Sequence, residues 1–114
     1  MIKKIISIKL RYDKYREKGK RENKVKKILC FGDSNTWGHN PVDCSQLEKP
    51  WTVWLKDIVP EYEIVSDGVC GRATTHYLEN EDKTNGLKDF RERYLSGEND
   101  FDLIIIMLGT NDVL

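Results

Sequence analysis

The sequence of 114 residues contains no apolar run long enough to cross a membrane. A membrane-spanning helix needs about 18 consecutive apolar residues, whereas the longest run here, residues 103–108, has the length of a buried strand. Collagen-like repeats, heptads and low-complexity tracts are also absent. The lack of a Gly-x4-Gly-Lys-Ser/Thr motif excludes a phosphate-loop nucleotide binder. We therefore expect a globular protein with no membrane span.

Cysteine is scarce, and its spacing excludes two further classes. Cys30, Cys44 and Cys70 form no zinc-type pair, and their odd number argues against a disulfide framework. A reducing cytoplasm is the simplest setting for such a protein. The acidic residues 79–82 (ENED) fit no EF-hand spacing. We interpret them as a solvated loop and expect no bound metal.

The sequence has no excess of either charge, but its charges are unevenly distributed. It carries 19 basic and 19 acidic side chains. Residues 1–27 hold 12 basic and 3 acidic residues, whereas residues 28–114 hold 7 basic and 16 acidic ones. This division predicts a basic N-terminal arm or linker over residues 1–24 and a globular domain over residues 25–114.

The basic arm allows two interpretations. Ile2, Ile5, Ile6 and Leu10 could line one face of a helix, which would suit an anionic membrane surface or a nucleic acid. The alternative is a solvated, partly helical tail, because basic arms attract polyanions nonspecifically. We favour the tail and expect no specific nucleic-acid partner. The apolar stretch is too short for a signal peptide and no small-residue cleavage site follows it, so we expect a cytoplasmic protein.

From residue 25 onward, apolar strands alternate with helices. Strands are predicted over residues 25–31, 62–66 and 101–108, and helices over residues 50–59 and 87–95. This alternation is typical of an α/β domain with a parallel sheet and right-handed crossovers. The continuous apolar character of residues 101–108 indicates burial on both faces of the sheet.

Each predicted helix has an apolar face. We expect Trp51 and Trp54 to pack the first helix against the sheet, with an acyl pocket that includes Trp37 as the alternative. The second helix carries its apolar side chains at Leu87, Phe90, Tyr94 and Leu95.

Small polar residues follow each strand, and the carboxyl ends of parallel strands meet at one edge of a sheet. Ser34 follows the first strand, Gly71 the second and Asn111 the third. A serine at this place can act as a nucleophile if a base removes its proton. The Ser34 N–H, the Gly71 N–H and the Asn111 amide could then stabilise an oxyanion.

A plainer interpretation is that Asp33, Ser34 and Asn35 only cap the next helix. We expect Asp33 and Asp112 to brace their own loops through local hydrogen bonds. Arg72 could either position its loop or contact a substrate carboxylate. Three converging loops that each offer an N–H donor favour an active site over a helix cap alone.

The three loops resemble known sequence blocks. Residues 32–38 (GDSNTWG) resemble the first block of the SGNH, or GDSL, hydrolases, and residues 68–74 (GVCGRAT) resemble the second. Residues 109–112 (GTND) match the third block, Gly-x-Asn-Asp. The Trp after the first block and the Gly-Arg-x-Thr segment are similar to the arylesterase and acyltransferase branch. The resemblance covers about residues 25–114 and has no counterpart for residues 1–24.

The resemblance implies a flavodoxin-like α/β fold, a three-layer parallel sheet with flanking helices. It also implies that Ser34 is the nucleophile of a serine esterase, with its own N–H, the Gly71 N–H and the Asn111 amide as the oxyanion hole. Short acyl esters would be the substrates, with water or an alcohol accepting the acyl group. No metal and no organic cofactor are implied.

The fourth block of the family, Asp-x-x-His, supplies the base, and this sequence contains no such segment. We expect His39 and His76 to lie in loops or to cap helices rather than to replace the base. Without a base Ser34 is a poor nucleophile. We therefore expect a truncated, weakly active or inactive esterase. The alternatives are a non-catalytic remnant of the same fold and a polyanion-binding module that uses the basic arm.

The resemblance also implies about five strands, of which the sequence supplies about three, with the first strand between the other two. Residues 101–108 would then form an exposed apolar edge. Such an edge promotes association, so we expect homo-oligomers or other contacts through it.

Overall fold

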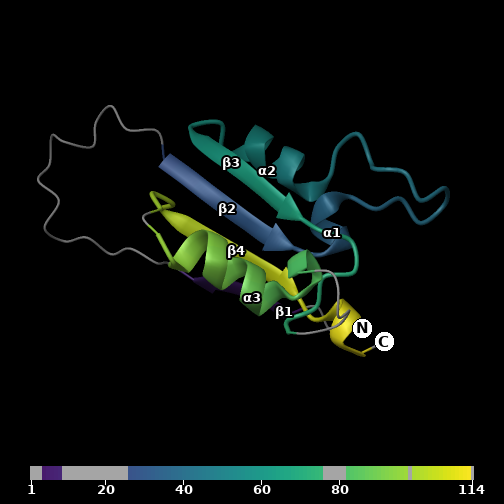
Figure 1. Ribbon diagram of the computed structural model, residues 1–114. Coiled ribbons are helices and arrows are strands. Elements are labelled where there is room, and N and C mark those ends of the chain that lie inside the picture. Colours follow the sequence, from purple (N-terminus) through teal and green to yellow (C-terminus); the bar gives the residue numbers. More distant parts are fainter. Residues whose placement is uncertain (1–3, 9–25, 76–81, 98, 114) are drawn as a thin grey trace, which may run out of the picture.

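The computed structural model describes residues 4–8, 26–75, 82–97 and 99–113. Its centre is one sheet with the strand order β1-β4-β2-β3. The strands are β1 (Lys4–Ile8), β2 (Lys26–Gly32), β3 (Tyr62–Gly68) and β4 (Leu103–Leu108). β2 pairs in parallel with both β3 and β4. The three predicted parallel strands and their order are therefore confirmed (Figure 1).

The strand β1 overturns two expectations about the ends of the sheet. It pairs antiparallel with β4, from Lys4 opposite Leu108 to Ile8 opposite Ile104. Ile5 and Ile6 thus belong to a strand, and a helical arm over these residues is wrong. The expectation that residues 101–108 form an exposed edge is also wrong. β1 supplies a hydrogen-bonding partner for β4, whose unpaired backbone groups would otherwise attract another strand.

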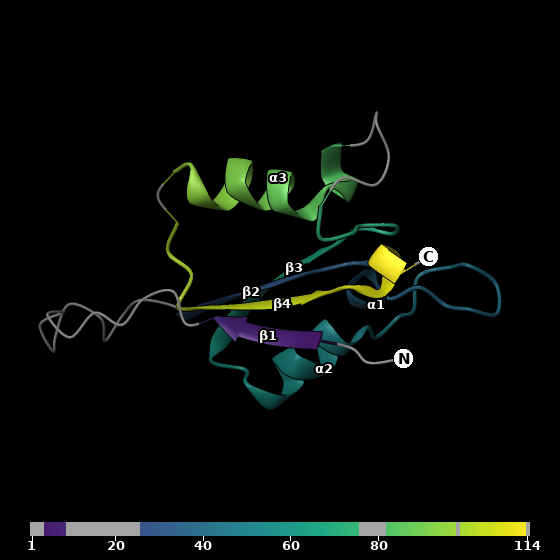
Figure 2. The same ribbon diagram turned by 90° about the horizontal axis from the view of Figure 1, so that it is seen from below.

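Helical segments lie on both faces of the sheet, which gives the three layers that the family resemblance implied (Figure 2). α2 (Trp51–Ile58) covers one face, and α3 (Gly86–Phe90) with the π-helical turn η2 (Arg91–Leu95) covers the other. The short helix α1 (Ser34–Trp37) follows β2 directly. Two 3-10 turns, η1 (Asp82–Thr84) and η3 (Thr110–Val113), complete the described elements.

The core lies between the sheet and the α3–η2 layer. Leu29, Phe31 and Ile104 are at most 1% exposed. Phe90 and Tyr94 place their rings edge-on to Phe31, with centroids at 5.1 and 6.1 Å. Such aromatic pairs add about 0.5–1.5 kcal/mol beyond the burial of their area. The core is therefore built on the ring of Phe31.

Three of the residues assigned to apolar helix faces are not buried. Leu87 and Leu95 are 49% and 56% exposed, so the apolar face of the second helix is narrower than predicted. Trp54 is 55% exposed and carries the Lys49 ammonium over its ring at 4.9 Å. Only Trp51 of the two α2 tryptophans turns inward, where its indole N–H donates to Thr36 Oγ1 at 3.3 Å. The expected packing of Trp54 on the sheet is therefore wrong.

Candidate active site

Residues 32–38, the Ser34 loop, turn the chain from β2 into α1. Asp33 is the N-cap of α1, and its Oδ1 accepts the backbone N–H of Asn35 at 2.9 Å and the side-chain amide of Asn35 at 3.0 Å. The Asp33 side chain is buried, as a residue that braces its own loop should be. Ser34 is the first residue of α1 and is half-buried. The cap thus holds Ser34 at the carboxyl end of β2.

Residues 68–74, the Gly71 loop, approach the Ser34 loop closely. A Cβ at Gly68 would lie 2.1 Å from the backbone nitrogen of Trp37, so only glycine fits there. The Val69 N–H donates to the carbonyl of Gly32 at 3.1 Å, which fastens the two loops together. Gly71 has a φ of +84°, a conformation that L residues rarely adopt. The glycines therefore allow both the close approach and the turn.

Residues 109–112, the Asn111 loop, contact the Gly71 loop through two side chains. The Asn111 amide donates to the carbonyl oxygen of Arg72 at 2.9 Å. The Asp112 carboxylate accepts the backbone N–H of Thr74 at 3.0 and 3.1 Å and its hydroxyl at 2.6 Å. We expected Asp112 to brace its own loop, and this is wrong, because its partner Thr74 lies 38 residues away. Asp112 instead connects two loops.

The Gly71 loop is thus the link between the other two, through Gly32 on one side and Asn111 on the other. The Asn111 amide nitrogen carries two hydrogens, and its bond to Arg72 uses one of them. No described residue accepts the second hydrogen. The convergence of three loops at the carboxyl edge of the sheet makes this edge the candidate active site.

Cys70 lies next to this site but is not a reactive thiolate. Partial burial raises the pKa of its thiol, and the negative charge of Asp33 raises that pKa further. A raised pKa keeps the thiol protonated at neutral pH, and a protonated thiol is a weak nucleophile. Cys70 is therefore a weaker candidate for a nucleophile than its position beside the site suggests.

Among the residues that the structure describes, no hydrogen bond joins a histidine ring to Ser34. His39 is exposed; its backbone N–H donates to the carbonyl of Ser34 at 2.9 Å, and its ring lies beside that of Trp37. His76 and residues 79–81 of the acidic segment lie outside the described residues. The part of the chain that the structure describes contains no cluster of three metal-ligating side chains and no helix suited to span a membrane.

Sequence reasoning left open the role of Arg72, and the structure decides it. The Arg72 side chain is completely buried, so it cannot meet a substrate carboxylate. Its Nε donates to the carbonyl of Lys83 at 2.8 Å, and its Nη1 donates to the carbonyls of Gly32 and Asp67 at 3.1 and 2.9 Å. Its Nη2 donates to the carboxylates of Asp67 and Asp89 at 3.2 and 2.7 Å.

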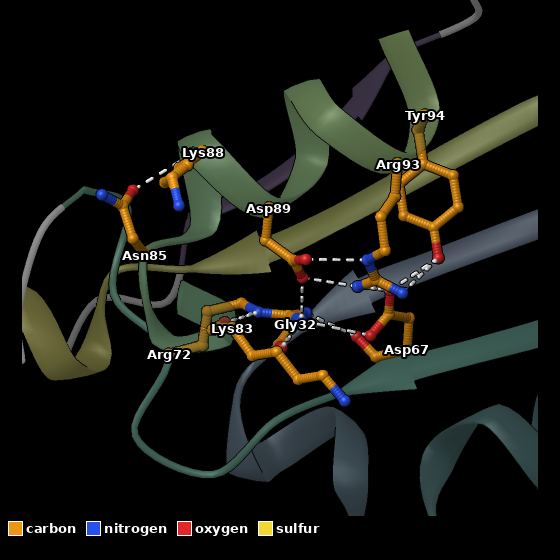
Figure 3. Close-up of polar contacts among 9 residues, drawn as sticks. All are labelled: Gly32, Asp67, Arg72, Lys83, Asn85, Lys88, Asp89, Arg93 and Tyr94. Atoms are coloured by element: carbon orange, nitrogen blue, oxygen red, sulfur yellow. Dashed lines mark hydrogen bonds and ion pairs between the residues drawn. The ribbon is translucent and has the colours of Figure 1, made fainter. Parts of the chain in front are cut away.

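Two further side chains extend this cluster toward the surface (Figure 3). Arg93 donates to both carboxylates, at 2.5 and 2.7 Å to Asp89 and at 2.6 Å to Asp67. The Tyr94 hydroxyl donates to Asp67 at 2.6 Å, and burial together with this bond raises the pKa of Tyr94. The same two carboxylates hold the pKa of Arg93 above its usual value. Two cations and two anions thus balance within one cluster.

Comparison with known proteins identifies the fold by structure alone, since no family model and no curated protein matches the sequence. A carbohydrate acetylesterase family member from Sinorhizobium meliloti aligns with a TM-score of 0.68 and 30% identity over 77% of this chain and 43% of that one. The aryl esterase of M. smegmatis aligns with a TM-score of 0.63 and 37% identity over 76% of this chain and 43% of that one. The chain therefore spans less than half the length of these structures.

These alignments show that the chain has part of the SGNH hydrolase fold, with parallel strands in one sheet and flanking helices. The resemblance to the SGNH hydrolases, over the N-terminal part of their fold, is confirmed.

Proposed function

We propose that the site is that of an SGNH-type serine esterase that acts on short acyl esters. The observation that supports this most strongly is the bond from the Asn111 amide to the carbonyl of Arg72, the residue after Gly71. This bond joins Asn111 to the residue that follows Gly71, at the same edge of the sheet as Ser34. The similarity to carbohydrate acetylesterase and aryl esterase structures supports the choice of acyl esters.

In this proposal the Ser34 hydroxyl attacks the ester carbonyl, a C–O bond forms, and the carbonyl oxygen takes up negative charge. The Ser34 N–H, the Gly71 N–H and the Asn111 amide donate to that oxygen. Solvent water takes up the proton of Ser34 and returns one to the leaving alkoxide, so collapse of the tetrahedral intermediate expels the alcohol and leaves an acyl group on Ser34. Water, or a second alcohol, then accepts the acyl group. Asp33 and Asp112 support the geometry through their bonds to Asn35 and Thr74.

The proton of Ser34 needs an acceptor, and the sequence contains no Asp-x-x-His segment to provide one. Loss of a triad member leaves only the catalysis that the oxyanion hole and binding supply. We therefore propose that this chain acylates Ser34 slowly and turns over weakly.

The test uses 4-nitrophenyl acetate, which has a good leaving group and so depends less on a base. Wild-type protein, Ser34→Ala and the control Ser66→Ala, an exposed serine of β3, are incubated with the ester. Release of 4-nitrophenolate and the mass of the Ser34 peptide are measured. We expect an acetyl group on Ser34 in wild type and in Ser66→Ala, and a rate at the solvent background in Ser34→Ala. No acetyl group on Ser34, with equal release by all three proteins, would refute the proposed esterase activity and leave the non-catalytic alternatives.

A further inference from the structure

Arg72 connects the two outer donors of the proposed oxyanion hole to the end of β2. Its carbonyl accepts the Asn111 amide, and its backbone nitrogen directly follows Gly71. Its guanidinium is bonded to the carbonyl of Gly32, two residues before Ser34. Together with the bond from the Val69 N–H to the carbonyl of Gly32, this side chain therefore links the loops of both outer donors to the segment that carries Ser34.

The chemistry of this contact requires arginine rather than any cation. The guanidinium is planar and donates from three nitrogens to acceptors on four separate segments, as Figure 3 shows. One flat face lies over the ring of Phe31, with the central carbon 4.0 Å from the ring centroid. A lysine keeps the charge but offers a compact ammonium with three donors and no planar face. Lysine at this position could not make the same set of bonds.

We propose that Arg72 is a positioning residue that holds Gly71 and Asn111 at the distance from Ser34 that oxyanion stabilisation needs. This inference rests on the proposed function. The carboxylates of Asp67 and Asp89 hold the guanidinium in place through its Nη2. Oxyanion donors act mainly in the transition state, so moving them lowers the rate of acylation while leaving ester binding unchanged. A residue that only stabilises the fold would not change the rate of the molecules that remain folded.

The test compares Arg72→Lys with the same exchange at Arg91, an exposed arginine of η2. The rate of Ser34 acetylation is measured over a series of 4-nitrophenyl acetate concentrations, at a temperature where both variants are folded. For Arg72→Lys we expect a fall of about tenfold in the maximal rate, less than the loss of a whole donor. The half-saturating concentration should not change. A maximal rate equal to that of Arg91→Lys would overturn the proposal.

Nuclear magnetic resonance of the Asn111 side-chain amide separates this inference from the proposed function. We expect the amide proton that is bonded to Arg72 to move toward the position of a free amide in Arg72→Lys and to stay in place in Arg91→Lys. If wild-type Ser34 is not acetylated, the proposed function fails. The Asn111 signals then test by themselves whether Arg72 positions Asn111. Unchanged Asn111 signals in Arg72→Lys would overturn the positioning role.

A second variant keeps the test decisive if Arg72→Lys does not fold. Arg93 is 41% exposed and binds the same two carboxylates, so Arg93→Lys loosens the anchors without emptying the Arg72 site. We expect a smaller fall in the acetylation rate and a smaller shift of the Asn111 signals in the same direction. A wild-type rate together with wild-type signals would overturn the proposal.

Discussion

The buried charge cluster leads to a specific prediction about stability. Asp89 and Asp67 are 8% and 11% exposed, and Arg72 is not exposed at all. Replacing Asp89 by asparagine leaves two cations against one anion in this enclosed place. Breaking a buried ion pair by removing one partner costs about 3–5 kcal/mol. Because the remaining Asp67 still binds Arg72 and Arg93 is partly solvated, we expect Asp89→Asn to lower the free energy of unfolding by about 2–4 kcal/mol.

A double-mutant cycle isolates the effect of charge balance. Arg93→Met alone should lower the free energy of unfolding by about 1 kcal/mol, because the Arg93 side chain is 41% exposed. The double variant Asp89→Asn/Arg93→Met leaves Arg72 and Asp67 as a balanced pair. It should therefore lower the free energy of unfolding by less than the sum of the two single changes. A coupling of about 1–2 kcal/mol is typical of residues that share one network. The assay is urea unfolding followed by circular dichroism.

The matched control is Asp57→Asn on α2. Asp57 faces Lys49 at 3.9 Å, and both side chains are more than half exposed. Exposed pairs of this kind contribute about 0–1 kcal/mol. If Asp89→Asn costs no more than Asp57→Asn, or if the effects of Asp89→Asn and Arg93→Met simply add, the reasoning from burial and charge balance is refuted.

Three further predictions concern packing and pH. Gly68→Ala should lower the free energy of unfolding by about 2 kcal/mol, because the new Cβ would lie 2.1 Å from a backbone nitrogen of α1. Gly97→Ala should leave the free energy of unfolding unchanged, because a Cβ at Gly97 would have no atom within 4 Å; urea unfolding of the two variants tests this. Burial raises the pKa of Cys30 from 9.0 to about 12, so its thiol ionises first in the unfolded chain. Stability should therefore fall as the pH rises from 9 toward 12, and urea unfolding of Cys30→Ala should show less of this fall. Phe31→Ala should cost about 3–5 kcal/mol, and Trp54→Ala, at a half-exposed position, less than about 1 kcal/mol; equal costs in urea would contradict the core described above.

The parallel part of the sheet could be predicted because its signals are local and strong. Continuous apolar runs and their alternation with helices specify strands that are buried on both faces. β1 could not be predicted in this way. Its three isoleucines and one lysine fit a helical face as well as a strand. What selects the strand is the unpaired edge of β4, far along the sequence.

Only part of the candidate site could be predicted, because several of its contacts join residues that are far apart in the sequence. The cap formed by Asp33 is local, with its partner Asn35 two residues away. The partner of Asp112 is Thr74, and the guanidinium of Arg72 reaches Gly32, 40 residues away. No short motif encodes such pairings. The exposure of Trp54 was missed because helical spacing shows which residues share a face but not how far the sheet extends beneath it.

The order of the strands has a consequence for folding kinetics. β2 and β3 are separated by a single crossover, with Lys26 opposite Tyr62, whereas β1 and β4 join Lys4 to Leu108 across almost the whole chain. Pairings between distant segments form late because loop closure must come first. We therefore expect β1 to add last, after β2, β3 and β4 have assembled. Until it adds, β4 is open to strands of other molecules, so the yield of refolding should fall as the protein concentration rises.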